Sequence, residues 1–467
     1  MKIITTDNNC GRCAVSHDSL SDLRHIADCP LSQLTDKECN DVWMFPNAES
    51  RYDDMIDNEN LISLSESRLT TGNIMGFIGY GDTELTIRSR FTHGNDGHDW
   101  FMQYMLQKVF AINIFNLKHA ISTQGSLDIA ALLLPYFLHK ALNQGIYREY
   151  VRCHYNDSRV RGAIDFNAHI RNNYPFKNGK VSYSTKEYKY DNSITQLVRH
   201  TIEFLRSQRD TFEVLYSNPE TQDNIKRIIE ATPSYSKGDR MRVINANLKP
   251  KIHPFYSEYR PLQKLCLQIL KREKLGYGDS TNRIYGVLFD GAWLWEEYLN
   301  IALSSVGFKH PKNKTGEGFI FPFKGRPNKY KRFPDFMKDK VVADAKYKYQ
   351  LTSSESTNRI HDNIQRDDLY QMISYIHITG ADTGLFISPT NIVCFDDQDG
   401  EQISEKDILM KTECLQICNV GTLNGYGGGI IIIGVNIPKY DMTYAEFESL
   451  MQMREQALKE SLLRLLN

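Results

Sequence analysis

Hydrophobic and polar residues follow two different periods along this chain. They alternate from Thr71 to Phe91 ("TGNIMGFIGYGDTELTIRSRF"), which predicts two or three strands. Helical spacing follows in "DWFMQYMLQKVFAINIFNL" and "SLDIAALLLPYFLHKALNQG", and recurs near residues 192–208, 219–231 and 258–274. Further strands are expected near the C-terminus, so the pattern predicts an α/β chain.

The length of 467 residues is enough for two or three domains. We expect a polar N-terminal extension of unknown role at residues 1–65 and a β-containing front domain with helices at 66–190. A helical connector is predicted at 191–280, and a mixed sheet flanked by helices at 281–467, with its core near 285–395.

Charge and hydropathy exclude some classes of partner. A formal net charge of −1 gives no overall attraction to nucleic acid or anionic membrane, so such binding must come from local patches. The longest apolar runs, such as "IAALLLP", are much shorter than the roughly 18 to 20 residues of a membrane span. The N-terminus lacks the apolar core of a secretory signal, and we expect a cytoplasmic protein with no membrane partner.

Nine cysteines are spread along the chain, which favours reduced thiols over disulfides. One group near the N-terminus has ligand types that suit zinc, with His17 and His25 nearby. Its cysteines are Cys10, Cys13, Cys29 and Cys39. Because no second CxxC or HxxxH follows, a structural Zn²⁺ and ordinary free thiols both stay open, and free thiols are favoured.

The glycine-rich stretch "LNGYGGGIIIIGVNIP" resembles a phosphate loop in composition only. No Gly-Lys-Ser/Thr follows it, and a strand is expected after the glycines in place of a helix N-terminus. We therefore predict that this chain binds no nucleotide.

Chemistry is concentrated in "RFPDFMKDKVVADAKYKYQ", residues 332–350. The pattern predicts two short strands around a polar turn, which would bring Asp335 close to Asp344. Asp344 and Lys346 share one strand face because side chains alternate. Two converging carboxylates repel each other unless a cation lies between them, and Mg²⁺ or Mn²⁺ suits such oxygen ligands. The backbone carbonyl of Ala345 is a further candidate ligand, and Lys346 would orient an attacking water or stabilise negative charge on phosphorus.

Helices on either side of this strand pair supply more polar candidates. The stretch 287–307 shows helical spacing and places Glu296 within an apolar stripe, where a carboxylate needs a partner or a position at the rim. In "RDDLYQMISYIHITG", Asp368, Gln371 and Tyr375 share one helix face. They could position the metal-site residues.

A basic loop precedes the two aspartates. "FPFKGRPNKYKRF" interleaves cations with aromatic residues and can bind DNA phosphates without base preference, although a solvated hairpin explains it equally well. Its candidate DNA-binding residues are Lys324, Arg326, Lys329, Lys331 and Arg332.

The order of these motifs resembles the PD-(D/E)XK nuclease superfamily, including its QxxxY element. Further segments, among them "TGNIMGFI", "GIYREY", "VRGAIDFNAHI" and "DDLYQMISY", are similar to the McrC family of McrBC restriction systems over roughly residues 65–395. The resemblance implies a PD-(D/E)XK fold for the C-terminal sheet. By position, it implies metal ligation by Asp335 and Asp344, a catalytic Lys346, a helix carboxylate at Glu296, and auxiliary roles for Gln371 and Tyr375.

The resemblance also implies partners. In that family the front domain docks to an AAA+ GTPase, McrB, and the back domain cuts double-stranded DNA, while recognition of 5-methylcytosine and GTP binding belong to McrB. We therefore expect a Mg²⁺-dependent endonuclease subunit of a defence system, which dimerises within a larger complex because one site cuts one strand. Arg148, Arg159 and Arg161 are candidates for contact with the GTPase.

Two other functions stay open at this point. One is a stand-alone repair or recombination nuclease of the same superfamily, which would bind DNA through its own front domain and cut without nucleotide. The other is a non-catalytic assembly module, which the intact Asp335, Asp344 and Lys346 argue against.

Overall fold

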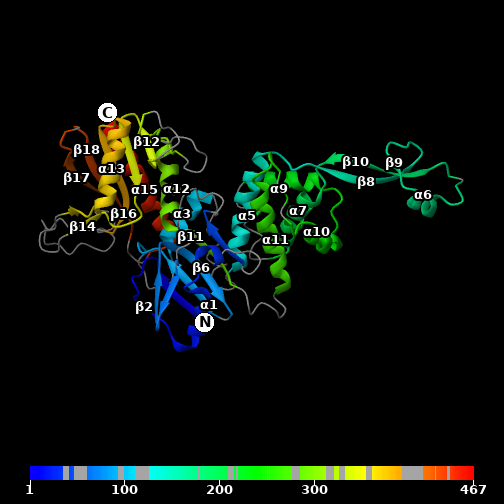
Figure 1. The fold of residues 1–467 in the computed structure, drawn as a ribbon, viewed down its shortest axis with the longest axis horizontal. Helices are drawn as coiled ribbons and strands as arrows, with labels where there is room; N and C mark the ends of the chain where they lie inside the picture. The colour runs from blue at the N-terminus through cyan, green and yellow to red at the C-terminus, as the bar shows by residue number, and fades with distance from the viewer. Residues whose placement is uncertain are drawn as a thin grey trace. The chain divides into compact units, whose positions relative to one another are not determined.

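The chain forms two compact units in the computed structural model (Figure 1). The first combines Met1–Ala111 with Ser280–Asn467, and the second is Ile112–Asp279. The residues that the structure describes are 1–34, 41–46, 60, 62–81, 83–92, 99–110, 126–176, 178–208, 215–216, 219–249, 251, 253–275, 284–311, 320–324, 332–353, 360–391, 414–425, 427–438 and 442–466.

A five-stranded sheet in the first unit pairs N-terminal strands with residues 285–290, in the order β1-β7-β6-β11-β3. Its strands are β1 (Lys2–Thr6), β3 (Asp41–Phe45), β6 (Ile74–Tyr80), β7 (Thr83–Arg88) and β11 (Tyr285–Asp290). β1 runs parallel to β7 and β3 parallel to β11, whereas β6 is antiparallel to both β7 and β11. Gly76 is required in β6 because a Cβ there would lie 2.1 Å from the carbonyl oxygen of Val287.

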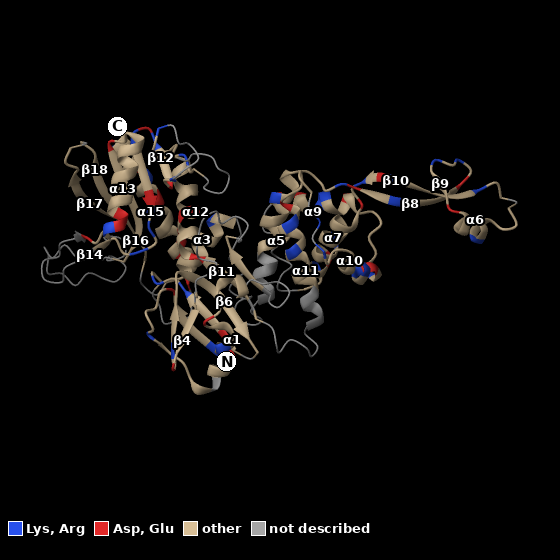
Figure 2. Cartoon of the chain, viewed as in Figure 1, with Lys and Arg blue, Asp and Glu red and all other residues tan. Residues whose placement is uncertain are grey.

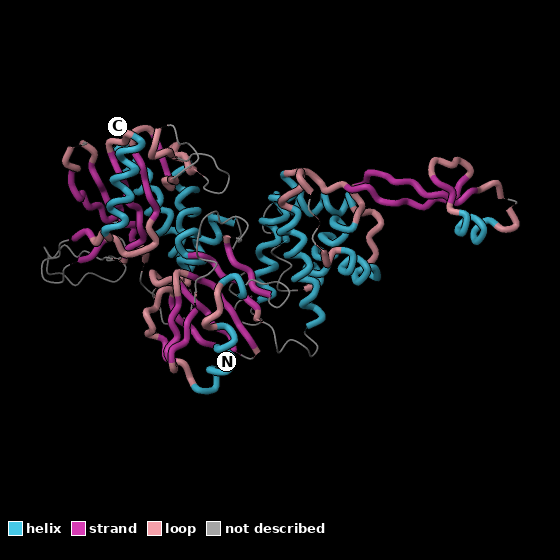
Figure 3. The backbone as a smooth tube through the Cα atoms, viewed as in Figure 1, coloured by secondary structure: helices cyan, strands magenta, loops and turns pink. Residues whose placement is uncertain are grey.

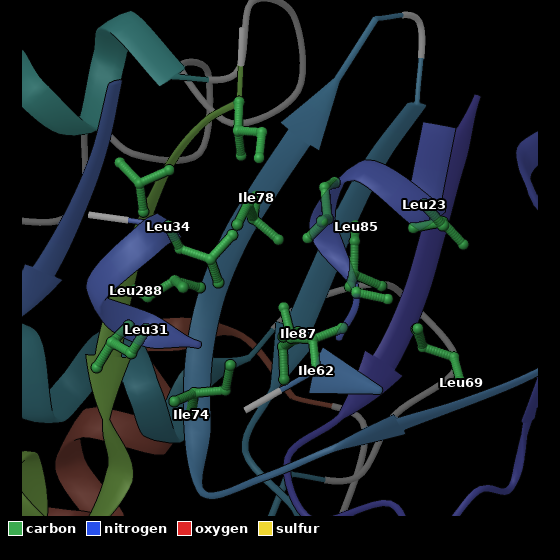
Figure 4. Packing of buried hydrophobic residues seen from close by; sticks show 14 of the residues in the cluster. Leu23, Leu31, Leu34, Ile62, Leu69, Ile74, Ile78, Leu85, Ile87 and Leu288 are labelled. Carbon is green, nitrogen blue, oxygen red and sulfur yellow. The ribbon is translucent and has the colours of Figure 1, made fainter. Parts of the chain in front are cut away.

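Apolar side chains from short helices cover this sheet. The helices are η1 (His17–Ser19), α1 (Leu20–Ile26) and α2 (Leu31–Leu34). Figure 4 shows Leu31 and Leu34 beside Ile78 and Leu288, all of which are buried. Fully burying each such side chain stabilises the fold by about 1.5–3 kcal/mol. A three-stranded sheet in the order β2-β5-β4 adjoins this core and is formed by β2 (Cys13–Ala14), β4 (Ile62–Ser65) and β5 (Arg68–Thr71).

A second five-stranded sheet in the first unit has the order β12-β13-β16-β18-β17. Its strands are β12 (Phe336–Lys338), β13 (Val341–Ala345), β16 (Thr383–Thr390), β17 (Leu415–Thr422) and β18 (Gly429–Asn436). β13, β16 and β18 are parallel, and the two edge strands are antiparallel to their neighbours. The predicted mixed C-terminal sheet is therefore confirmed, and so is the α/β class.

The helices α12 (Gly291–Ser304), α13 (Arg366–Thr379) and α15 (Tyr444–Leu466) pack against this second sheet. The helix α3 (Trp100–Phe110) packs against α12 and α15. α12 contacts β13 and α3, α13 contacts β13 and β16, and α15 contacts β17 and β18. A small hairpin of β14 (Leu351–Ser353) and β15 (Ile360–Asp362) follows β13 in the chain. The region predicted as one helix from 287 to 307 is divided, because residues 285–290 pair between β6 and β3 and the helix begins only at Gly291.

The second unit consists of packed helices and one long hairpin. Its helices are α5 (Ser126–Asn143), α7 (Ser193–Ser207), α9 (Pro219–Ala231), η5 (Lys237–Asp239), α10 (Arg240–Ala246) and α11 (Tyr259–Leu275). The hairpin pairs β8 (Glu149–Asp157) with β10 (Val181–Lys189), and β9 (Ala163–Ile164) and α6 (Phe166–Asn173) lie at its far end (Figure 3).

These two units divide the chain differently from the sequence prediction. Residues 1–65 are not an appended extension, because β1 and β3 are strands of the sheet that contains β11. The predicted front domain, 66–190, is split between the units, and its part beyond Ala111 joins the helices predicted as a connector. In the part of the chain that the structure describes, no helix has the length and apolar character needed to cross a membrane.

Candidate active site

Asp335 and Asp344 come together through the hairpin of β12 and β13. Phe336 pairs with Ala343 across the two strands, and the turn between them contains Asp339 at a positive φ of 50°. The Asp335 Oδ2 atom accepts a hydrogen bond of 2.7 Å from the backbone amide of Ala345, directly after Asp344. Asp335 itself precedes β12, so it is not a strand residue as the pattern suggested.

Lys346 lies between carboxylates at the end of β13. Its Nζ atom is 2.6 Å from Asp344 Oδ2 and 3.4 Å from Asp368 Oδ1. Asp344 is only 3% exposed, so this ion pair is largely shielded from water. The backbone amide of Lys346 donates to the carbonyl oxygen of Ile387 at 3.0 Å, which holds the lysine against β16.

The helix α13 presents its polar side to this lysine. Gln371 Oε1 accepts a hydrogen bond of 2.9 Å from Lys346 Nζ, and Gln371 Nε2 donates to the hydroxyl of Tyr375 at 3.0 Å. The Tyr375 hydroxyl donates to the carbonyl oxygen of Phe333 at 3.2 Å. Gln371 and Tyr375 therefore connect Lys346 to the chain just before Asp335 through hydrogen bonds.

Asp368 joins a second lysine to the site. Lys348 Nζ lies 2.5 Å from Asp368 Oδ2, which also accepts a hydrogen bond of 3.2 Å from Gln350 Nε2. Burial raises the pKa of Asp368, but the contacts with Lys348 and Lys346 outweigh it, and the pKa is lowered overall. Figure 2 shows both signs of charge at the start of α13.

Glu296 projects from α12, whose N-terminus is capped by Asp290. The Asp290 carboxylate accepts hydrogen bonds from the amides of Ala292 and Trp293, which fixes where the helix begins. Glu296 Oε1 lies 3.6 Å from Nε2 of His310, and His310 Nδ1 is 2.7 Å from the backbone carbonyl oxygen of Asp335.

His310 was not predicted as a site residue. Its ring stacks on Phe336, and its side chain is 7% exposed. It is far from Asp335 in the sequence and stands in no recognisable motif, so no sequence signal points to it.

The electrostatics of the site centre on Asp335. Burial raises the pKa of Asp335 well above its usual range, and the nearby carboxylates of Glu296 and Asp344 raise it further. Burial lowers the pKa of Lys346, but Asp344 and Asp368 more than offset this, and the pKa ends above its ordinary value. The lysine is therefore held as an ammonium group.

The donor set of Asp335, Asp344 and the Ala345 carbonyl suits a hard cation. No group of three or more His, Cys, Asp or Glu side chains among the described residues has metal-site spacing. Mg²⁺, however, commonly takes only one or two carboxylates and keeps several waters. The Asp344 Oδ2 atom is buried and lies 2.6 Å from Lys346 Nζ.

The other predicted residues fall partly outside the described chain. Lys324 and Arg332 are described and exposed, whereas Arg326, Lys329 and Lys331 lie outside the described residues. Of the candidate zinc ligands, Cys10, Cys13 and Cys29 carry free thiols and form no metal-like group among the described residues, and Cys39 lies outside them.

Comparisons with known proteins find one family and two similar solved structures. The family model described as "McrBC 5-methylcytosine restriction system component" matches residues 69–389. No curated protein matches. A half-complex refined from a tetradecameric assembly of Thermococcus gammatolerans McrB AAA+ hexamers with bound McrC aligns with 97% of this chain and 99% of that chain, at 15% identity and a TM-score of 0.44. A cryo-EM structure of the Thermococcus gammatolerans McrBC complex aligns with 66% and 88% of the respective chains, at 13% identity and a TM-score of 0.32.

Proposed function

Because the chain belongs to the family of McrBC 5-methylcytosine restriction system components, we propose that it is the subunit that cuts DNA in such a system. The reaction is hydrolysis of a phosphodiester bond in double-stranded DNA, supported by Mg²⁺ or Mn²⁺ at Asp335 and Asp344. The proposal includes a PD-(D/E)XK arrangement of the second sheet. The observation that carries it is the convergence of Asp335, Asp344 and Lys346 where β12 begins and β13 ends.

Each residue has a chemical role in this proposal. Asp335, Asp344 and the Ala345 carbonyl would hold the cation, which supplies Lewis acidity and a more acidic bound water. Lys346 stabilises negative charge that builds on the phosphorus, because its raised pKa keeps it protonated. Gln371 fixes the direction of the lysine through the hydrogen bond to Lys346 Nζ.

Docking to an AAA+ GTPase would use the second unit. The far end of its hairpin exposes large apolar side chains, among them Phe166 at 70% and Tyr174 at 76%, and such side chains are typical of contact surfaces. The candidate arginines have ordered surroundings: the guanidinium carbon of Arg148 lies 3.8 Å from the ring centre of Tyr190, and Arg161 Nε donates to the Tyr183 hydroxyl at 3.2 Å. Dimerisation within the complex would supply a second site for the other DNA strand.

The experiment is reconstitution with an McrB-type GTPase, followed by cleavage of methylated and unmethylated DNA with and without GTP. We expect GTP-dependent cutting of the methylated substrate. Robust cutting by this chain alone, without nucleotide, would favour the stand-alone nuclease instead.

A pair of lysine variants, each assayed below its unfolding transition, tests the chemistry assigned to Lys346. Lys346→Met should abolish cutting while GTPase stimulation stays intact. Lys340→Met is its control, because Lys340 forms an exposed ion pair of 2.9 Å with Asp382 at the opposite end of β13. Normal cutting by the Lys346 variant would refute the proposed role.

A further inference from the structure

Three residues next to the ends of β1, β6 and β7 form a buried charged group that the proposed cleavage chemistry does not use. We call Asp7, Asn73 and Arg90 the arginine cluster. Arg90 Nε donates to Asp7 Oδ2 at 2.8 Å and its backbone amide donates to Asp7 Oδ1 at 2.5 Å, while its terminal nitrogen contacts Asn73 Oδ1. The Asp7 side chain is fully buried, and that of Arg90 is 14% exposed.

The arginine cluster holds the segment that directly follows Lys346. The guanidinium carbon of Arg90 lies 4.9 Å from the ring centre of Tyr347, and the Tyr349 hydroxyl donates to the backbone carbonyl of Arg90 at 3.2 Å. The buried Tyr347 hydroxyl also lies 2.6 Å from the hydroxyl of Ser89. Both tyrosines are therefore fixed by residues next to or within the cluster.

The same cluster holds the start of the helix that carries Glu296. The backbone carbonyl of Asn73 accepts a hydrogen bond of 3.0 Å from the amide of Gly291, the first residue of α12. Asn73 Nδ2 also lies within hydrogen-bond distance, 3.5 Å, of the capping carboxylate of Asp290. A Cβ at Gly291 would lie 2.7 Å from the Tyr347 ring, so helix and tyrosine are in close contact here.

We propose that the arginine cluster sets the position of Lys346 relative to Glu296, and that Asp7, Asn73 and Arg90 are positioning residues for DNA cleavage. This inference rests on the proposed nuclease function. It gives the N-terminal strands a role in positioning the active site.

Energetics favour positioning over stabilisation as the reason for this cluster. Burying an ion pair costs the free energy of hydration of both charges, and their mutual attraction does little more than offset this cost. The pair therefore contributes little net stability. Burial raises the pKa of Asp7 to about 6 even though Arg90 counteracts the shift. What such a pair supplies is a fixed geometry, and a displacement of about 1 Å can slow a reaction by roughly 100-fold.

The test uses the full chain reconstituted with its GTPase. Arg90→Met removes the guanidinium and its contacts, and Arg90→Lys restores the charge opposite Asp7. Because Arg90→Met leaves Asp7 buried without its countercharge, the double variant Asp7→Asn/Arg90→Met removes both charges and decides the outcome if the single variant does not fold. Arg454→Met is the matched control, since Arg454 is a buried arginine of the same unit that donates to the carbonyl oxygens of Asn436 and Leu450.

Cleavage kinetics and GTPase stimulation are measured below the unfolding transition of each variant. We expect Arg90→Met and the double variant to lower kcat roughly 10- to 100-fold with KM for DNA changed less than about twofold, while Arg90→Lys recovers part of the rate. GTPase stimulation should stay at the wild-type level, and Arg454→Met should leave kcat unchanged.

The outcomes separate the two proposals. If the wild-type complex cuts and a folded cluster variant cuts at the wild-type rate, the positioning role is wrong and the nuclease function stands. An equal loss of kcat in Arg454→Met would also overturn it, because the effect would then follow any loss of a buried arginine. If the wild-type complex does not cut at all, both proposals fail.

Discussion

Replacing Lys346 with Met should destabilise the metal-free protein strongly. Lys346 and Asp344 form an ion pair of 2.6 Å in which the side chains are 17% and 4% exposed. Removing one partner of such a buried pair leaves an uncompensated charge, which costs about 3–5 kcal/mol. Asp368 still has Lys348 as a partner at 2.5 Å in this variant. Most of the loss of stability therefore arises from the unpaired Asp344 carboxylate. The double variant Asp344→Asn/Lys346→Met lacks that unpaired charge and should recover most of the stability.

Urea unfolding followed by tryptophan fluorescence measures this directly. All four tryptophans, Trp43, Trp100, Trp293 and Trp295, belong to the first unit, so the signal reports the unit that holds the site. Millimolar Ca²⁺ should restore part of the stability of Lys346→Met, since a cation at the carboxylates replaces the lost ammonium. A loss below about 1 kcal/mol, typical of exposed pairs, would refute the reasoning, and so would a double variant no more stable than the single one.

Three further predictions concern the neighbours of this pair. Because the folded-state pKa of Asp335 is raised, Asp335 contributes stability at acidic pH that is lost as the pH rises through its folded-state pKa. Urea unfolding across a pH series should therefore show a flatter decline for Asp335→Asn than for the wild type. His310→Ala should weaken Mn²⁺ binding about 10-fold in calorimetric titration by releasing Glu296 and the Asp335 backbone, with His310→Gln in between; unchanged binding would contradict its role. Asp290→Ala should lower stability by about 1 kcal/mol in the same tryptophan-monitored unfolding by removing the cap of α12, and no change would show that the cap is dispensable.

Local features of the fold could be predicted from the sequence. The helices expected near 192–208, 219–231 and 258–274 correspond to α7, α9 and α11, because each carries its own apolar stripe. The partners of β1 and β3 could not be predicted, since Lys2–Thr6 pairs with β7 and Asp41–Phe45 pairs with β11 across long sequence separations. Residues 287–290 were misassigned to a helix because a short apolar run fits a helix or a buried strand equally well.

Some residues of the site could likewise be predicted from local sequence, and others could not. Asp335 and Asp344 are joined by a tight hairpin, so their proximity follows from local pairing. Gln371 and Tyr375 were found through helical spacing and a motif. His310 and Arg90 reach the site only through tertiary packing, and neither residue type nor spacing marks them in the sequence.

The most direct test of the central claim is cleavage of methylated DNA by the complex reconstituted with Asp344→Asn, measured with GTP and Mg²⁺ beside Asp382→Asn. Asp382 is an exposed aspartate that forms an ion pair with Lys340 at the other end of β13. Its variant is therefore a control for the loss of one aspartate charge from this sheet. We predict no cutting by Asp344→Asn, wild-type cutting by Asp382→Asn, and GTPase stimulation in both. Cutting at the wild-type rate by Asp344→Asn would contradict the account, because the carboxylate proposed to hold the cation would then be unnecessary.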